Sequence, residues 1–148
     1  MGGLGAAARA PGRTRPPAGE PQGMTGDAEV VVVAAFRARP GEEAAVERAL
    51  LQLVPPTHGE AGCIAFAVHR GADDPRRLVA VERWRDRAAL DAHLATPWVG
   101  DYRRAVEGRR SEPPRVDVLH ALPAGDPAKG TNRGVAALGD RELVGPVD

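Results

Sequence analysis

Two strand-like segments joined by a short turn constrain the fold of this 148-residue chain more than any other feature. Residues 63–70 alternate larger apolar side chains with smaller ones, and residues 78–84 show the same alternation. Between them, Gly71-Ala-Asp-Asp-Pro75 has the composition of a hairpin turn, because glycine, aspartate and proline favour reversal of the backbone. The two strands are therefore predicted to be antiparallel neighbours.

Apolar periodicity and proline breaks indicate the remaining elements. Residues 29–39 are nearly continuous valine and alanine, the pattern of a strand covered on both faces. A helix should follow Pro40-Gly41, and Pro55-Pro56 should end or bend it. After two short helices, residues 115–122 should form the last strand. This order predicts a ferredoxin-like α+β fold, a split βαβ arrangement with a four-stranded antiparallel sheet and helices on one face.

The two short helices carry recognisable start signals. Asp86 is expected to cap the first helix, and Thr96 the second, with Pro97 at the first helical position, where its missing N–H costs nothing. The side chains expected on the buried faces recur at helical spacing: Leu90, His93 and Leu94 in the first helix, and Trp98, Tyr102 and Val106 in the second.

Composition divides the chain into three segments. Residues 1–27 are rich in proline, glycine and arginine without apolar periodicity, so we expect a disordered extension and no signal peptide. Met24 is an alternative translation start. Residues 28–123 form the predicted domain, and residues 124–148, where glycine, proline and aspartate return, are expected to be a disordered tail.

Charge and cysteine content exclude several classes of partner. The 20 basic and 20 acidic residues balance, and no basic stripe stands out, so nucleic acid is not the expected partner. No apolar run is long enough for a membrane span. Cys63 is the only cysteine, which excludes a disulfide framework and suits a reducing cytoplasm. Of the 20 basic residues only Lys129 is lysine, which suggests a GC-rich, bacterial source.

Rare residues gather between positions 82 and 102. Both tryptophans, the only tyrosine and one of the four histidines lie there, although aromatic residues make up 3% of the chain. Side chains from three strands and a helix are candidates to wall a pocket for a small aromatic ligand: Phe36, Phe66, Trp84, Trp98 and Tyr102. Plain core packing is the competing interpretation.

His93 is the candidate general base, since imidazole titrates close to neutral pH. A buried histidine bonded to a neighbour is the alternative. Tyr102 is a candidate donor, and Glu82 and Arg103 are candidates to orient the base or stabilise an oxyanion, with surface ion pairs as the alternative for both. The other histidines lie on separate elements without metal-ligand spacing, so no metal site is expected.

Four short motifs resemble the antibiotic biosynthesis monooxygenase superfamily, and within it the small quinol monooxygenases. The matching text is Arg39-Pro-Gly41, Glu60-Ala-Gly-Cys63, Glu82-Arg-Trp84 and Ala-Leu-Asp-Ala-His-Leu-Ala-Thr-Pro at residues 89–97. The resemblance covers about residues 28–123 and implies a dimeric α/β barrel. It also implies an enzyme that needs no cofactor and uses O2 to oxidise a quinol or a polyketide-like phenol to a quinone. One position departs from the family pattern, because Trp98 stands where a histidine is usual.

Two other activities occur among proteins that resemble this one. A haem-degrading branch has Asn on the first strand and Trp and His on the helices. Here the only asparagine is Asn132 in the tail, and His93 and Arg103 stand near the two helix positions, so haem degradation is disfavoured. A non-oxidative isomerase or lyase, or a dimeric binding module, stays open because fold does not fix function.

Overall fold

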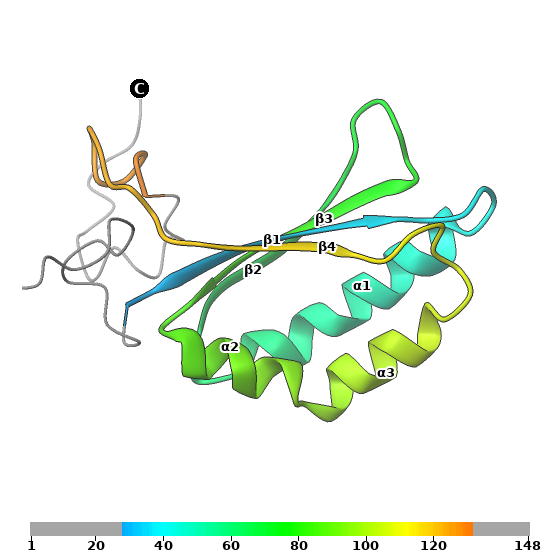
Figure 1. The fold of residues 1–148 in the computed structure, drawn as a ribbon, viewed down its shortest axis with the longest axis horizontal. Helices are drawn as coiled ribbons and strands as arrows, with labels where there is room; N and C mark the ends of the chain where they lie inside the picture. The colour runs from blue at the N-terminus through cyan, green and yellow to red at the C-terminus, as the bar shows by residue number, and fades with distance from the viewer. Residues whose placement is uncertain (1–27, 132–148) are drawn as a thin grey trace, which may run out of the picture.

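The computed structural model describes residues 28–131 and shows three helices beneath one face of a four-stranded sheet (Figure 1). Its elements, in chain order, are β1 Val30–Arg37, α1 Glu43–His58, β2 Cys63–Arg70, β3 Arg77–Trp84, α2 Arg87–Leu94, α3 Pro97–Ala105 and β4 Arg115–Leu119. The predicted ferredoxin-like α+β fold is confirmed. The last strand is shorter than predicted, because it ends at Leu119 and not at residue 122.

The sheet has the strand order β2-β3-β1-β4, and every neighbouring pair is antiparallel, including the predicted hairpin of β2 and β3. The register of β1 against β3 fixes which side chains share a face. Val32 lies opposite Glu82, and Phe36 lies opposite Leu78. Because side chains alternate along a strand, these four residues all point toward the helices.

The core lies between this face and the helices. Val32, Ala34, Leu78, Ala80 and Trp84 are all buried. From the helices, Leu50 and Leu53 of α1 and Leu90 of α2 are buried against them. The sheet therefore supplies a mostly small, apolar floor on which the helical side chains rest.

Helix α1 continues through Pro55-Pro56 to His58, although the sequence predicts an end or a bend there. Each proline lacks the N–H that would bond to the carbonyl four residues earlier. Those carbonyls belong to Leu51 and Gln52, which are exposed, so water can satisfy them. The local cost is therefore small enough for the packed face of α1 to keep the helix intact.

The caps of α2 and α3 match the predicted start signals. The Asp86 carboxylate accepts a hydrogen bond from the Ala89 N–H at 2.8 Å, and Thr96 accepts one from the Val99 N–H at 3.4 Å. The predicted buried stripe of α3 is wrong in one position, because Val99 and not Trp98 is buried with Tyr102 and Val106. A strict four-residue repeat drifts by about 40° per step in a helix of about 3.6 residues per turn, so Trp98 turns away from the face of Val106. Val99 precedes Val106 by seven residues, which is close to two full turns.

The opposite face of the sheet is partly covered by the chain that follows β4. Arg83 points to this face and is only 2% exposed. Its guanidinium donates to the Glu29 carboxylate and to the backbone carbonyl of Thr131, which is also buried. The segments 1–27 and 132–148, which include most of the two predicted tails, lie outside the described residues. Among residues 28–131, no helix is long and apolar enough to cross a membrane.

Candidate functional site

A cavity of about 410 Å³ lies between the sheet and the helices. Its volume falls within the range of about 300–1,000 Å³ that is typical of ligand pockets. Most of its wall is apolar, and it is lined by Val32, Phe36 and Phe66 from the sheet and by Leu90 and Val99 from the helices. Leu94 and the β4 side chains Val116 and Val118 line it too and are exposed, so the cavity opens between β4 and the two short helices.

Six of the eight sequence-predicted site residues line this cavity. They are Phe36, Phe66, Glu82, His93, Tyr102 and Arg103. The two tryptophans do not line it. Trp84 is fully buried behind His93, and Trp98 lies at a separate hollow beside Pro56.

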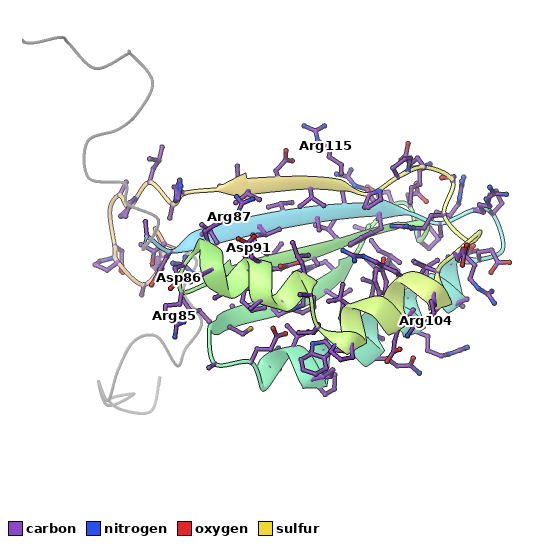
Figure 2. The ribbon with its side chains drawn as sticks, turned by 60° about the horizontal axis from the view of Figure 1, so that its bottom comes forward. Arg85, Asp86, Arg87, Asp91, Arg104 and Arg115 are labelled. Atoms are coloured by element: carbon purple, nitrogen blue, oxygen red, sulfur yellow. The ribbon has the colours of Figure 1, made fainter. Side chains whose placement is uncertain are left out.

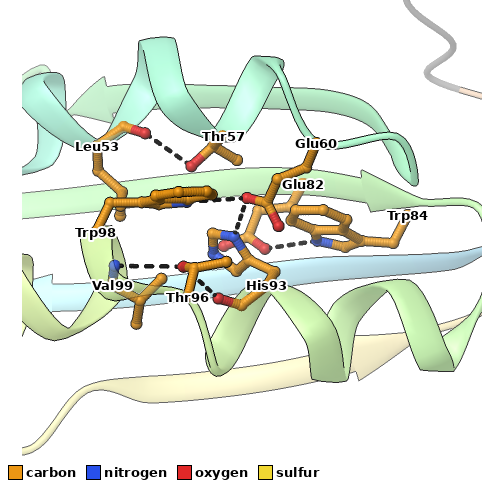
Figure 3. A network of polar contacts seen from close by, with 9 residues as sticks. All are labelled: Leu53, Thr57, Glu60, Glu82, Trp84, His93, Thr96, Trp98 and Val99. Atoms are coloured by element: carbon orange, nitrogen blue, oxygen red, sulfur yellow. Dashed lines mark hydrogen bonds and ion pairs between the residues drawn. The ribbon is translucent and has the colours of Figure 1, made fainter.

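His93 is held in place by a carboxylate. Its Nδ1 lies 2.8 Å from Oε2 of Glu60, and the same oxygen lies 3.1 Å from the Trp98 indole nitrogen (Figure 3). An indole N–H can only donate, so Oε2 serves as an acceptor, and His93 Nδ1 is then the second donor. This arrangement leaves Nε2 as the nitrogen of His93 that is free to bind a proton.

Aromatic rings fix the plane of the His93 imidazole. The Trp84 ring lies against it with a centroid distance of 4.6 Å and an interplanar angle of 35°. Phe66 lies on another side at 5.7 Å, and His93 is only 3% exposed. The imidazole is therefore both hydrogen-bonded and confined by packing.

Glu82 lies in the floor of the cavity beside this imidazole. Burial raises the pKa of its carboxyl, while the hydrogen bond from Trp84 and the nearby His93 act in the opposite direction. The Trp84 indole nitrogen donates to Glu82 Oε2 at 2.8 Å. The interpretation of Glu82 as a surface ion pair is therefore wrong, since the residue is 6% exposed and its partner is an indole.

Tyr102 presents an unsatisfied hydroxyl. Its ring packs edge-on against Phe36 at 5.9 Å, and the residue is 8% exposed. Burial raises the pKa of the phenol to about 12, and the Arg110 guanidinium offsets this only in part. Although Arg110 is near enough to act on that pKa, no hydrogen bond of acceptable geometry reaches the hydroxyl from any described residue.

The family model for antibiotic biosynthesis monooxygenases matches residues 29–106, which include every element that builds the cavity except β4. The chain belongs to the antibiotic biosynthesis monooxygenase family. It is therefore an enzyme of monooxygenase type, as the sequence motifs predict.

The sequence similarity to known relatives extends over most of the length of each relative. Rv0793 of Mycobacterium tuberculosis is 37% identical over 93 residues, which are 63% of this chain and 91% of the relative. "Probable quinol monooxygenase YgiN" of Escherichia coli K12 is 34% identical over 89 residues, covering 53% of this chain and 86% of the relative. Among solved structures, PA3566 of Pseudomonas aeruginosa is 31% identical with a TM-score of 0.62, covering 67% of this chain and 99% of that one.

The other three histidines of the monooxygenase chain do not line the cavity. The rings of His58, His69 and His120 each contact a backbone carbonyl, at distances from 2.9 to 3.3 Å. Within residues 28–131 there is no group of three potential metal ligands. Burial raises the pKa of the Cys63 thiol to about 11, which keeps it protonated and a poor nucleophile.

Sequence reasoning missed two residues of the site. Glu60 is part of the Glu-Ala-Gly-Cys motif, but its contact with His93 joins positions 33 residues apart and depends on tertiary packing. Arg110 lines the cavity because its backbone pairs with Ala38 just beyond β1. No local signal marks this pairing, since Arg110 lies in an irregular segment between α3 and β4.

Proposed function

We propose that this chain is a cofactor-independent monooxygenase that uses O2 to oxidise a quinol or another electron-rich phenol to a quinone. The observation that carries the proposal is that His93 lines an apolar cavity and is held from behind by the Glu60 carboxylate. Such a reaction needs a base, a water-poor pocket for an aromatic ring and O2, and a donor for the developing negative charge. The cavity has a candidate for each.

The first step is removal of the phenolic proton by His93 Nε2. The Glu60 carboxylate stabilises the imidazolium that forms, because opposite charges attract strongly in a poorly hydrated site. Trp84 and Phe66 keep the ring from turning during the transfer. Glu60 therefore acts as a positioning residue, in the way that a carboxylate orients the histidine of a hydrolase triad.

The substrate anion then passes one electron to O2, and the two radicals join in a C–O bond to give a peroxide. Loss of the proton on that carbon and cleavage of the O–O bond release one water and leave a carbonyl, which gives a quinone from a simple phenol and a hydroxyquinone from a quinol. The four electrons that O2 takes up all come from the substrate, so no other reductant is needed. Burial favours the protonated form of Glu82, which makes this carboxyl a candidate donor to the departing oxygen.

Tyr102 is the candidate donor to the oxyanion. Both indole N–H groups already donate to carboxylates, while the Tyr102 hydroxyl is buried and has no partner among the described residues. Negative charge in an extended aromatic anion is shared among its conjugated oxygens. The hydroxyl can therefore stabilise an oxygen remote from the one that His93 deprotonates.

A homodimer is part of the proposal. Val31, Val33, Val79 and Val81 lie on the sheet face that the helices leave uncovered, and all four are only half-buried. An apolar face of this kind favours association, and a second copy of the sheet is its natural cover. Equilibrium sedimentation at micromolar concentration tests it, with a dimer expected and a monomer contradicting it.

Oxygen uptake with a panel of quinols and phenols tests the activity. We expect uptake above the uncatalysed rate for at least one compound, lost in the His93→Gln variant. Absence of uptake for every compound would refute the proposal. Turnover that continues without oxygen would instead favour an isomerase or lyase, and binding without turnover would favour a binding module.

A further inference from the structure

The cavity has two ends of different chemistry. Glu82 pairs with Val32 of β1. His93 packs against Phe66, the β2 partner of Glu82, so the acid-base groups lie at this end. Tyr102 packs against Phe36, four residues further along β1, and the Arg110 backbone pairs with Ala38 beyond it. At about 3.3 Å per residue, the Val32 and Phe36 positions are roughly 13 Å apart. A ligand that reaches both ends is therefore longer than a single aromatic ring.

The Tyr102 end offers hydrogen-bond donors, and no carboxylate of the described residues lines the cavity there. Arg103 and Arg110 line the cavity there, and within residues 28–131 neither side chain forms an ion pair. Their neighbours behave differently, since Arg104 pairs with Asp101 and Arg109 with Glu42. The buried and unpartnered Tyr102 hydroxyl adds a third donor and is an independent sign that a polar ligand group belongs at this end.

Acidic side chains do not neutralise these two arginines in the described structure. Glu107 and Glu112 share a neighbouring surface hollow with them, but neither comes within ion-pair distance. Arg87, the third arginine of the cavity wall, pairs with Asp91 at 3.4 Å (Figure 2). The unbalanced positive charge is therefore concentrated at the Tyr102 end.

We propose that Arg103 and Arg110 bind a carboxylate of the substrate, so that the enzyme selects polycyclic aromatic acids whose quinol ring lies at His93. The proposal rests on the proposed function, in which this cavity holds the substrate. Both arginines are more exposed than Tyr102, so they hold the carboxylate toward the entrance while the hydroxyl meets an oxygen of the ring system. Guanidinium groups suit this role because they bind carboxylates with two parallel hydrogen bonds.

Binding without oxygen separates this proposal from the proposed activity. The probe is 5,8-dihydroxy-2-naphthoate, whose quinol and carboxylate lie on different rings, compared with its methyl ester and with 1,4-dihydroxynaphthalene. Quenching of tryptophan fluorescence under anaerobic conditions reports the dissociation constant, since the Trp84 ring lies against His93, which lines the cavity. We expect the acid to bind about 10-fold or more tightly than either neutral compound, with the preference weakening at high salt.

Variants assign the preference to particular side chains. Arg103→Gln and Arg110→Gln should each weaken binding of the acid by about 10-fold while changing binding of the neutral compounds less than about 2-fold. Arg104→Gln is the matched control, because Arg104 is on the same helix as Arg103 but pairs with Asp101 and does not line the cavity. This variant should bind the acid and the neutral compounds as wild type does.

Equal binding of the acid and its ester overturns the proposal, as does a loss in the arginine variants that is the same for all three compounds. Oxygen uptake with neutral quinols, without a preference for the acid, would leave the monooxygenase activity standing and refute only the carboxylate site. A charge-dependent preference without any oxygen uptake would support the carboxylate site and refute the activity.

Discussion

His93 Nδ1 lies 2.8 Å from Glu60 Oε2, and the same oxygen accepts from the Trp98 indole at 3.1 Å. The contact favours the imidazole tautomer with the proton on Nδ1 and the lone pair on Nε2. It also places the Glu60 carboxylate beside the His93 imidazole, which becomes positively charged when it takes up a proton. The two interpretations of His93 from sequence, a base and a bonded core histidine, are therefore compatible, and function must separate them.

Replacement of His93 by glutamine separates the two roles. Glutamine is a fair helix former and can still bond to Glu60, so we expect the free energy of unfolding to fall by only about 1 kcal/mol. Oxygen uptake per folded molecule should fall about 100-fold or more, as is usual when a positioned proton acceptor is lost. Thermal melting and uptake are measured on one sample. A destabilised variant with near wild-type turnover would end the general-base assignment.

Replacement of Glu60 by glutamine tests the positioning role. The amide keeps the shape of the side chain and one acceptor oxygen but removes the charge that stabilises the imidazolium. We expect kcat to fall about 10-fold or more while KM changes little, because Glu60 does not line the cavity. Glu60→Asp, which restores the charge, should recover part of kcat. An increase in KM with unchanged kcat would contradict the assignment.

Glu82 should make stability depend on pH. The pKa of this carboxyl in the folded chain is raised from the ordinary value of 4.5. As the pH rises past 4.5, the folded chain therefore keeps a proton that the unfolded chain loses. Stability from this group is complete at low pH and is lost as the pH rises through the raised pKa, by at most about 1.4 kcal/mol per pH unit. Urea unfolding from pH 4 to 8 measures it.

The comparison for this measurement is Glu82→Gln, which cannot ionise. Wild type should lose stability relative to this variant as the pH rises, and the difference isolates Glu82 from other titrating groups. Glu107→Gln, at an exposed position, serves as the control and should follow the wild-type curve. Parallel curves for wild type and Glu82→Gln would show that burial does not raise the pKa.

Tyr102→Phe removes a buried hydroxyl that has no partner among the described residues. Because no hydrogen bond is lost and a desolvated polar group disappears, the free energy of unfolding should stay within about 0.5 kcal/mol of wild type or rise. Turnover should fall, by about 10-fold or more, if the hydroxyl stabilises the oxyanion. Urea unfolding and oxygen uptake check the two parts. A loss of stability above about 1 kcal/mol would reveal a structural partner.

Local signals in the sequence were sufficient for most of the fold. Strand alternation, the turn at residues 71–75 and the caps at Asp86 and Thr96 each depend on neighbours in the chain, and the structure has all of them. Pro55-Pro56 misled because the effect of a proline depends on whether solvent can reach the freed carbonyls. That depends on the face of α1 that packs against the sheet.

The candidate site was predicted less completely, because its contacts join distant segments. His93, Glu82 and Tyr102 were found by residue type and face. Trp84 and Trp98 were expected in the pocket wall, but neither lines the cavity. Their indoles lie outside it and donate to the carboxylates of Glu82 and Glu60. The alternation of a strand tells which face a ring occupies and not its depth below the cavity. Glu60 was missed because its contacts depend on the packing of a loop against α2 and α3, which no periodicity records.

A cut in the chain after β4 tests the contact between Arg83 and Thr131. The sequence predicts no loss of stability from removing the tail, but in the structure residues 124–131 bring a carbonyl onto a buried guanidinium. A chain that ends at Pro123 would lose this acceptor and expose Arg83 to water. A chain that ends at Gly134 keeps it and places the new carboxylate three residues beyond Thr131.

We expect the shorter of these two chains to be less stable by about 1.5–3 kcal/mol, the range for a hydrogen bond to a charged group. The same pair of cuts in an Arg83→Gln background completes a double-mutant cycle and isolates the contact from other effects of residues 124–134. There the difference should shrink to about 0.5 kcal/mol or less. Urea unfolding at several protein concentrations measures all four chains and separates folding from association. An equal loss in both backgrounds would show that the segment contributes through packing and not through Arg83.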